Sequence, residues 1–194
     1  MSSSGQARAA VGLTLLSTLE RDHPDLAAEV RAKLSENTSR EYDTLATLRW
    51  VTMKAHMDLS DHIRAAVGST NNADFWRRAS LEVLNRPLLG FVQTFTKLMG
   101  TPPKVLVRVA PVILPQLFKH IGTFTMRTVE EEDHFAVGAF RGFPASEYSL
   151  MCFVEGVSGS LVSAGHVVGI EVEVTRLFVD AVGDFDLAIR RNAP

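Results

Sequence analysis

The sequence predicts an α+β fold in which a helical N-terminal subdomain packs on a small antiparallel sheet. Up to Ile121, the apolar residues recur mainly at helical spacing. From Gly122 onward, apolar and polar residues alternate in several short segments, which is the period of a strand. One apolar helical segment separates these strands, so their predicted order is ββαββ. The 194 residues suit one domain with a disordered start over 1–6, a helical part over 7–121 and a sheet-plus-helix part over 122–191.

The predicted helices each combine an apolar stripe with a polar, glycine or proline residue at their end. They cover about 7–19, 26–34, 42–67, 75–84, 88–99 and 103–121. Gly68 and Gly100 are suitable residues to end the third and fifth helices. Pro111 and Pro115 fall inside the sixth helix, so we expect a kink there or two short helices.

The C-terminal third alternates strands with one helix. Strands are predicted at about 123–128, 134–140, 170–176 and 184–190, and the helix at about 146–164. Within that helix, Gly156 and Gly159 each cost about 1 kcal/mol relative to alanine, so we expect another backbone to pack closely there. Glu171 and Glu173 only partly protect the strand Ile170–Arg176, so this edge also predicts a possible homodimer contact.

Charge and composition exclude several classes of partner. A formal net charge of −2 gives no basic surface for nucleic acid or an anionic membrane. The start lacks a basic leader followed by an apolar run, and no apolar stretch reaches about 20 residues, so no membrane insertion is expected. Cys152 is the single cysteine, which excludes an intramolecular disulfide. These features predict a soluble cytoplasmic protein.

No catalytic motif stands out. Cys152 lies among apolar residues of a predicted helix, which favours a buried, inert thiol over a nucleophile. Ser158 lies between Val157 and Gly159 and resembles half of a nucleophile elbow, but that motif needs a strand before the turn. The run Glu130–Asp133 lacks the spacing of a calcium loop and is read as a solvated turn. We therefore predict a protein that is not an enzyme.

The histidines give no clear metal site. His56 and His62 are six residues apart, which places them on different faces of a helix. His120 lies near the end of the predicted helix over 103–121, where it is either a helix-end histidine or an axial ligand, the second only if haem binds. No metal is predicted otherwise.

Large and flexible apolar side chains in the helical part could line a ligand pocket or simply fill a core. The residues that we expect to line such a pocket are Trp50, Met53, Met57, Phe91 and Phe95.

A series of short landmarks carries a family resemblance. They are Trp50, Gly68, Gly100–Pro103, Val109–Pro111, Gly122, Gly142–Pro144, Cys152, Gly156, Ala164–His166, Gly169–Thr175 and Gly183–Leu187. Their order resembles an uncharacterised bacterial, myxobacterial-type paralogous family, related to the superfamily of haem NO-binding, four-vinyl-reductase and TRAPP-like domains. The resemblance covers roughly Val11 to Arg191.

The resemblance implies a helical subdomain over a small sheet, and a sensory or scaffolding role. Relatives of the TRAPP type hold an acyl chain in an apolar tunnel, which implies that Cys152 borders the pocket. Haem NO-binding domains carry a Tyr-x-Ser-x-Arg motif for the haem propionates, whereas Phe140–Pro144 stands here and no arginine follows Tyr148 and Ser149 in that pattern. Nor does a histidine occupy the helix just before Gly100. On this basis we expect no cofactor and disfavour haem.

The function predicted from the sequence is a non-catalytic module in bacterial signalling. It would sense an apolar small molecule or bind a protein partner. Two alternatives are a haem-based gas sensor of the haem NO-binding type and a hydrolase that uses Cys152 or Ser158.

Overall fold

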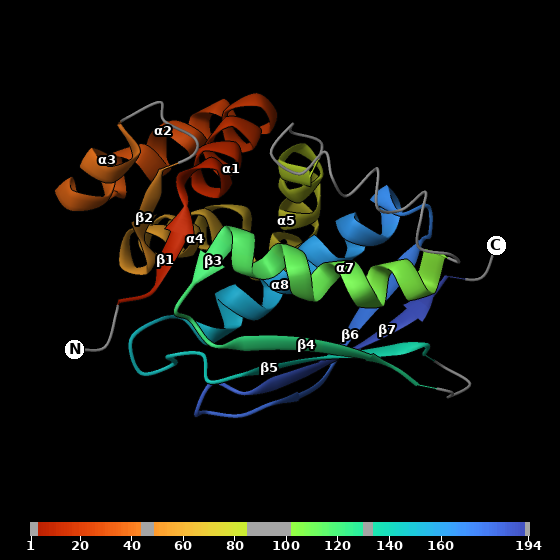
Figure 1. Cartoon of the computed structure of the whole chain (residues 1–194). Helices are drawn as coiled ribbons and strands as arrows, with labels where there is room; N and C mark the ends of the chain where they lie inside the picture. The colour runs from red at the N-terminus through yellow and green to blue at the C-terminus, as the bar shows by residue number, and fades with distance from the viewer. Residues whose placement is uncertain (1–3, 44–48, 85–101, 130–133, 193–194) are drawn as a thin grey trace.

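The computed structural model describes residues 4–43, 49–84, 102–129 and 134–192, and it confirms the α+β class (Figure 1). Its helices are α1 (Ala9–Asp22), α2 (Pro24–Lys33), α3 (Glu36–Tyr42), α4 (Met53–Val67), α5 (Ser69–Leu84), α7 (Pro102–Leu117) and α8 (Leu150–Val167). A small sheet has the order β2-β1-β3, from β1 (Gln6–Arg8), β2 (Trp50–Thr52) and β3 (Phe118–Lys119). A larger sheet has the order β4-β5-β7-β6, from β4 (Thr123–Thr128), β5 (Ala136–Arg141), β6 (Val172–Val179) and β7 (Phe185–Arg191).

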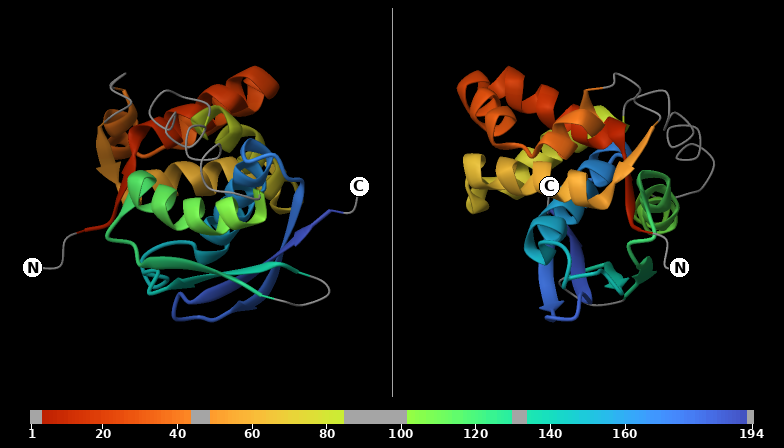
Figure 2. Two further views of the ribbon diagram at one scale, coloured as in Figure 1. Left: turned by 45° about the vertical axis from the view of Figure 1, so that its right-hand side comes forward. Right: turned by 90° about the vertical axis from the view of Figure 1, so that its left-hand side faces the viewer.

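The described elements form three layers. The four-stranded antiparallel sheet lies at one side, α7 and α8 lie across it, and α1 to α5 form the outer layer (Figures 1 and 2). Edge-to-face phenylalanines join the sheet to α8: the Phe153 ring on α8 lies 5.2 Å from Phe140 on β5 and 6.2 Å from Phe185 on β7, measured between ring centroids. The core therefore runs from the sheet through α8 into the helical layer.

The small residues of α8 have the packing role expected of them. A Cβ atom added to Gly159 would lie 2.4 Å from the carbonyl oxygen of Ala73 on α5, and one added to Gly156 would lie 3.1 Å from the Trp76 ring. The two helices approach so closely because these positions carry no side chain. Among the described helices, α8 alone has the length and apolar composition of a membrane span, but more than half of it is buried inside the fold, as in a core helix.

The predicted long helix over 42–67 is wrong. Tyr42 belongs to α3, and residues 50–52 form strand β2 before α4 begins. Strand β2 pairs with β1, with Ala7 opposite Val51, and the Thr52 side chain caps α4 by accepting a hydrogen bond from the amide of Ala55. The partner strand lies more than forty residues away, so helical periodicity could not reveal it.

Two other expectations change. Gln6 is paired with both Thr52 and Lys119, so ordered structure begins within the segment expected to be disordered. The helix α7 continues through Pro111 and Pro115, so the alternative of two short helices is wrong. Each proline lacks an N–H, so the carbonyl four residues before it loses its helical hydrogen bond. Because the prolines are four residues apart, the two carbonyls lie on the same side of the helix, and since Pro115 is exposed, water can solvate them there.

Candidate functional site

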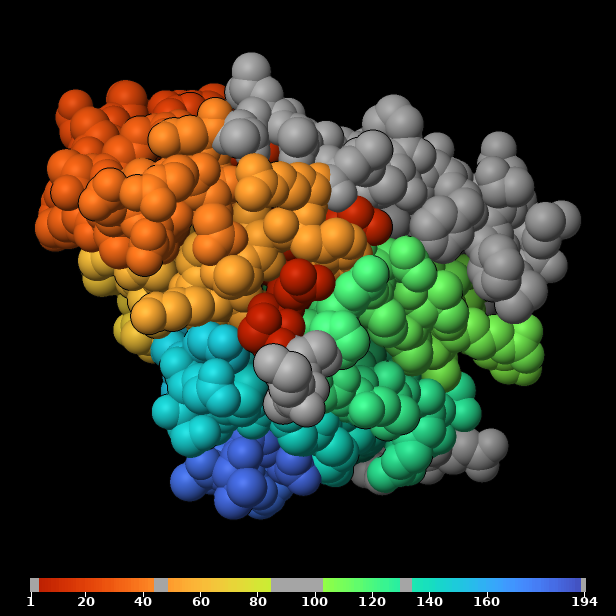
Figure 3. Space-filling model, turned by 60° about the vertical axis from the view of Figure 1, so that its left-hand side comes forward, coloured from red at the N-terminus to blue at the C-terminus, as the bar shows by residue number. Residues whose placement is uncertain are grey.

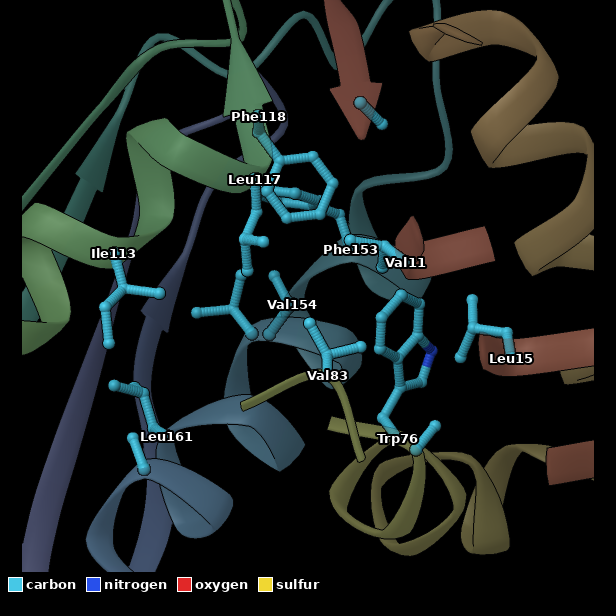
Figure 4. Packing of buried hydrophobic residues seen from close by; sticks show 14 of the residues in the cluster. Val11, Leu15, Trp76, Val83, Ile113, Leu117, Phe118, Phe153, Val154 and Leu161 are labelled. Carbon is cyan, nitrogen blue, oxygen red and sulfur yellow. The ribbon is translucent and has the colours of Figure 1, made fainter. Parts of the chain in front are cut away.

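An apolar cavity lies where α4, α5, α7 and α8 meet. Its lining residues are Val11, His56, Met57, Ser60, Trp76, Ser80, Val83, Leu84, Ala110, Ile113, Leu114, Leu117, Phe118, Phe124, Cys152, Phe153, Gly156, Val157, Ser160, Leu161 and Ala164. Figure 4 shows how side chains of α1, α5, α7 and α8 converge here. The cavity volume is about 60 Å³. Since one water needs about 10–15 Å³, a molecule of only a few heavy atoms fits while the walls stay in place.

His56 is the one imidazole in this lining, and it is fully buried. Its ring lies 5.4 Å from Phe118 and 6.0 Å from Trp76, measured between centroids. Burial lowers the pKa of His56 to about 4, so the ring is neutral near pH 7. The pKa of the Tyr42 hydroxyl is raised, mainly by burial, so that hydroxyl keeps its proton.

Tyr42 determines which nitrogen of His56 is available. The Tyr42 hydroxyl lies 3.3 Å from Nδ1, and Nε2 has no hydrogen bond within the described ranges. In the tautomer whose Nδ1–H donates to the Tyr42 oxygen, Nε2 carries a lone pair. A neutral imidazole oriented through its second nitrogen is the usual state of a metal-ligating histidine.

The hydroxyl groups of the lining already have partners. Ser60 donates to the carbonyl of His56 at 2.8 Å, and Ser160 lies 2.8 Å from the hydroxyl of Ser80 and donates to the carbonyl of Gly156 at 2.8 Å. Among the described lining residues, His56 therefore has a ring nitrogen, Nε2, that can bind a ligand.

Cys152 also lines the cavity, but its thiol is poorly suited to chemistry. Burial, and then the neighbouring Asp61 carboxyl, raise its pKa far above the usual range, so the thiolate is disfavoured. Ser158 donates its hydroxyl to the carbonyl of Val154 within α8. The Asp61 carboxyl beside Cys152 raises the pKa of the thiol instead of lowering it, and the Ser158 hydroxyl donates to a backbone carbonyl, so the geometry lends no support to the hydrolase alternative.

The structure gathers only part of the pocket predicted from the sequence. Met57 and Cys152 line the cavity. Met53 is buried elsewhere in the core, and Trp50 lies on β2 with the side chains of Arg8 and Lys119 against its ring. Phe91 and Phe95 lie outside the described residues. His120 is exposed in the turn after β3 and does not line the cavity.

The sequence analysis missed His56 as a cavity residue, because it weighed His56 only as a partner of His62. The available signal was its spacing: His56 lies three residues from Met53 and four from Ser60, so it shares the buried face of α4 with them. The contribution of α7 and β3 could not be read from spacing, since Ile113, Leu117 and Phe118 reach the cavity through tertiary packing.

The architecture around this cavity is a known α+β fold. The sequence matches no protein-family model and none of the curated proteins. Among solved structures, it is similar to the H-NOX protein from K. algicida, with a TM-score of 0.64, 12% identity and coverage of 96% of this chain and 97% of that one. It is also similar to a Cs H-NOX variant, with a TM-score of 0.60, 13% identity and coverage of 96% and 97%. A third is an oxygen-binding H-NOX domain related to soluble guanylate cyclases, with a TM-score of 0.56, 14% identity and coverage of 96% of both chains. The chain therefore has the H-NOX fold.

These comparisons correct one prediction. The sequence analysis expected no cofactor and disfavoured haem because two motif positions are missing. Several of the solved structures that are similar to this chain are described by an H-NOX name with an Fe(II) state, by heme distortion or by heme redox potential. The prediction that dismissed haem is therefore wrong, because the absence of short motifs was too local a criterion.

The cavity fits haem in part. Its apolar walls suit the macrocycle, and the neutral His56 suits an axial ligand. No lysine or arginine belongs to the described lining, so partners for the two carboxylates must lie beyond it. A cavity of about 60 Å³ is much smaller than haem, so the cavity walls would have to move apart to admit it. Trp76 Nε1 has no hydrogen-bond partner in the described ranges, but it is turned toward α1 near Leu15 (Figure 4), so it does not mark a ligand contact.

Proposed function

We propose that this chain is a non-catalytic sensor domain that would bind haem in the cavity, with His56 as the residue that would hold the iron. The observation that carries the proposal is a fully buried, neutral imidazole in an otherwise apolar cavity of an H-NOX fold. Bound haem would supply an iron atom that takes up a diatomic gas. A role in cytoplasmic bacterial signalling, with a protein partner, follows as part of the same proposal.

The residues of the chain have distinct tasks in this arrangement. Tyr42 holds the His56 ring through Nδ1 and leaves Nε2 for the ligand. Phe118 and Trp76 flank the ring and exclude water from it. The close contact between α5 and α8 at Gly159 makes one wall rigid, so the adjustment needed for a large ligand falls on the α7 side.

Haem titration of the purified protein, followed by its Soret absorption, tests the proposal. Wild-type protein should show a shifted, saturable Soret band at one haem per chain. The variant His56→Gly should bind weakly and change the band, and added imidazole should restore it. His62→Gly is the matched control, because His62 lies on the same helix but is only half-buried and outside the cavity lining. The absence of a Soret shift in wild type, or identical spectra for His56→Gly, would refute the proposal.

A second candidate ligand is a small uncharged apolar molecule. The cavity as it stands favours it, since the described lining carries no charged side chain and its volume is about 60 Å³. Xenon is a suitable probe, because dry apolar cavities in proteins take it up and a single atom fits the volume present. Saturable changes at Val83 and Val157 methyl resonances on adding xenon, lost in Val157→Phe, would support this candidate. Unchanged spectra would exclude it.

A further inference from the structure

Positive charge is concentrated in one segment of the chain. No aspartate or glutamate occurs between Glu82 and Glu130, although the chain contains 22 of these residues. The same segment holds six of the 20 lysines and arginines, so the remaining residues carry a formal charge of −8. The overall net charge of −2 therefore combines a basic segment with an acidic remainder.

The described part of this segment displays its charge along one face of α7. Lys104, Arg108, Val112 and Gln116 follow one another at intervals of four residues, and all four are exposed. Residues four apart lie on the same side of a helix, about 6 Å from each other along its axis. Together with Lys119, which follows on β3, these residues form a line that we call the basic stripe. Its apolar member, Val112, is 52% exposed.

The basic stripe ends at an aromatic side chain of the small sheet. The Lys119 ammonium lies 4.2 Å from the centroid of the Trp50 ring, and the Arg8 guanidinium lies 3.9 Å from the same centroid. Arg8 also joins β1 to the end of α7, because its Nε donates to the carbonyl of Gln116 at 3.3 Å. Figure 3 shows β1 next to the segment that runs from α7 to β4. A half-buried tryptophan with two cations against its ring therefore adjoins the stripe.

The cations of the basic stripe are not neutralised by the described part of the chain. Within the described ranges, Lys104, Arg108 and Lys119 form no ion pair with a carboxylate, whereas Arg64 on α4 pairs with Glu155 at 2.8 Å. Lys104 also lies in the first turn of α7, where the positive end of the helix dipole disfavours a cation. This arrangement does not stabilise the helix, which favours a role in binding a negatively charged group.

We propose that the basic stripe is the docking surface for an acidic amphipathic helix of a partner protein. A helix laid along α7 would set carboxylates one turn apart against Lys104 and Arg108, and an apolar side chain against Val112. Trp50 would supply the large aromatic contact that protein interfaces favour. The inference names the class of the protein partner that the proposed function includes and rests on it to that extent, but it does not require haem.

A protein helix fits this surface better than a lipid bilayer or a nucleic-acid duplex does. The helix α7 has 16 residues and is therefore about 24 Å long. A bilayer or a long duplex extends beyond that length and would meet the remainder of the chain, whose formal charge of −8 repels it. The exposed Val112 also offers an apolar contact in the middle of the stripe, which suits an amphipathic helix.

A designed acidic peptide tests the proposal on the full chain. The peptide has glutamate and leucine at helical spacing over about 15 residues, because shorter isolated helices are marginal in water. Its matched control has glutamine in place of every glutamate. In an NMR titration, the acidic peptide should shift the backbone amide resonances of the basic stripe, and the glutamine peptide should leave them unchanged. Added salt should weaken the binding, because it screens exposed charges.

Substitutions in the basic stripe should weaken the binding of the acidic peptide. Lys104→Gln and Arg108→Gln should each do so about threefold, as expected for one exposed ion contact, and the double variant Lys104→Glu/Arg108→Glu by about tenfold. Arg176→Gln is the matched control and should bind as wild type does. Arg176 is an exposed arginine of β6, which lies at the other edge of the larger sheet from β4, the strand against which α7 packs.

The folded state of each variant is checked by circular dichroism before titration. Because Lys104→Gln removes a cation from the positive end of the α7 dipole, its melting temperature should not fall below that of wild type. A loss of peptide binding in this variant then reports on the surface and not on stability.

The outcomes separate this proposal from haem binding. If the acidic peptide binds in a manner that depends on Lys104 and Arg108, the docking surface stands, even where wild type gives no Soret shift and the haem proposal fails. If wild type does not bind the peptide, or the double variant binds it as wild type does, the docking surface is refuted and the haem proposal is unaffected. Phosphatidylserine vesicles and a DNA duplex are titrated in parallel, and preferential binding of either one would overturn the proposal.

Discussion

Protonation of His56 should destabilise the folded protein, and the size of the effect follows from its burial. The pKa of about 4 in the folded state lies below the ordinary value of 6.5, which the unfolded chain retains. Above pH 6.5 the imidazole is neutral in both states. As the pH falls from 6.5 toward 4, the unfolded chain binds a proton that the folded chain does not. The difference of about 2.5 pH units corresponds to about 3 kcal/mol of stability lost by pH 4.

Urea denaturation at several pH values between 7.5 and 4 measures this loss. Wild type and His56→Gln are compared, because glutamine does not titrate and the difference between the two curves isolates His56 from all carboxylates. We expect the free energy of unfolding to fall over this range by about 3 kcal/mol more in wild type than in His56→Gln. Ser60→Ala is the control: it alters the same site without removing a titrating group and should keep the wild-type pH dependence. Parallel curves for wild type and His56→Gln would show that His56 is not buried as described.

Three further predictions concern α8. Gly159→Ala forces a methyl group against the α5 backbone, so the packing penalty falls at the upper end of about 1–3 kcal/mol and exceeds the gain in helix propensity of about 1 kcal/mol by about 1–2 kcal/mol. Calorimetry should show a melting temperature lower by about 2–8 °C, while Ser158→Ala on the same helix stays close to wild type; an unchanged value for Gly159→Ala would contradict the close contact. Glu155→Ala removes a bidentate pair with Arg64 at 2.8 and 3.0 Å and should cost about 1–3 kcal/mol in urea denaturation, whereas Glu155→Gln should recover part of it. Cys152 should react with Ellman's reagent only in urea, because burial raises its thiol pKa; rapid labelling of the native protein would disprove its burial.

Local patterns were most informative in the sheet-bearing third. The strand at 123–128 coincides with β4, and the strand predicted at 170–176 overlaps β6 (Val172–Val179). Their alternation reflects one buried face, which depends on neighbours two residues apart. The small residues at Gly156 and Gly159 also predicted a close backbone contact, and α5 makes that contact. In contrast, the strand β2 was read as helix, because its partner β1 lies far away in the chain.

The candidate site, too, could be predicted from local sequence patterns only in part. Met57 and Cys152 could be chosen from composition, since flexible and apolar residues suit a cavity wall. His56 acquires its depressed pKa only through the rings of Trp76 and Phe118 and the other side chains that bury it. A second hollow, formed by the end of α7, by β3 and by the start of β4, likewise exists only because these segments meet in the fold, and no spacing in the sequence encodes that meeting.

The sequence by itself thus determined the α+β class, the strands of the larger sheet and the close approach at α8, because these depend on periodicity and side-chain size over a few residues. Only the tertiary structure decided that α4, α5, α7 and α8 enclose a cavity, that His56 is its imidazole, and that the fold is that of the H-NOX proteins. Burial, pKa and ligand access are properties of groups brought together from distant parts of the chain, and a linear pattern does not record which distant groups will meet.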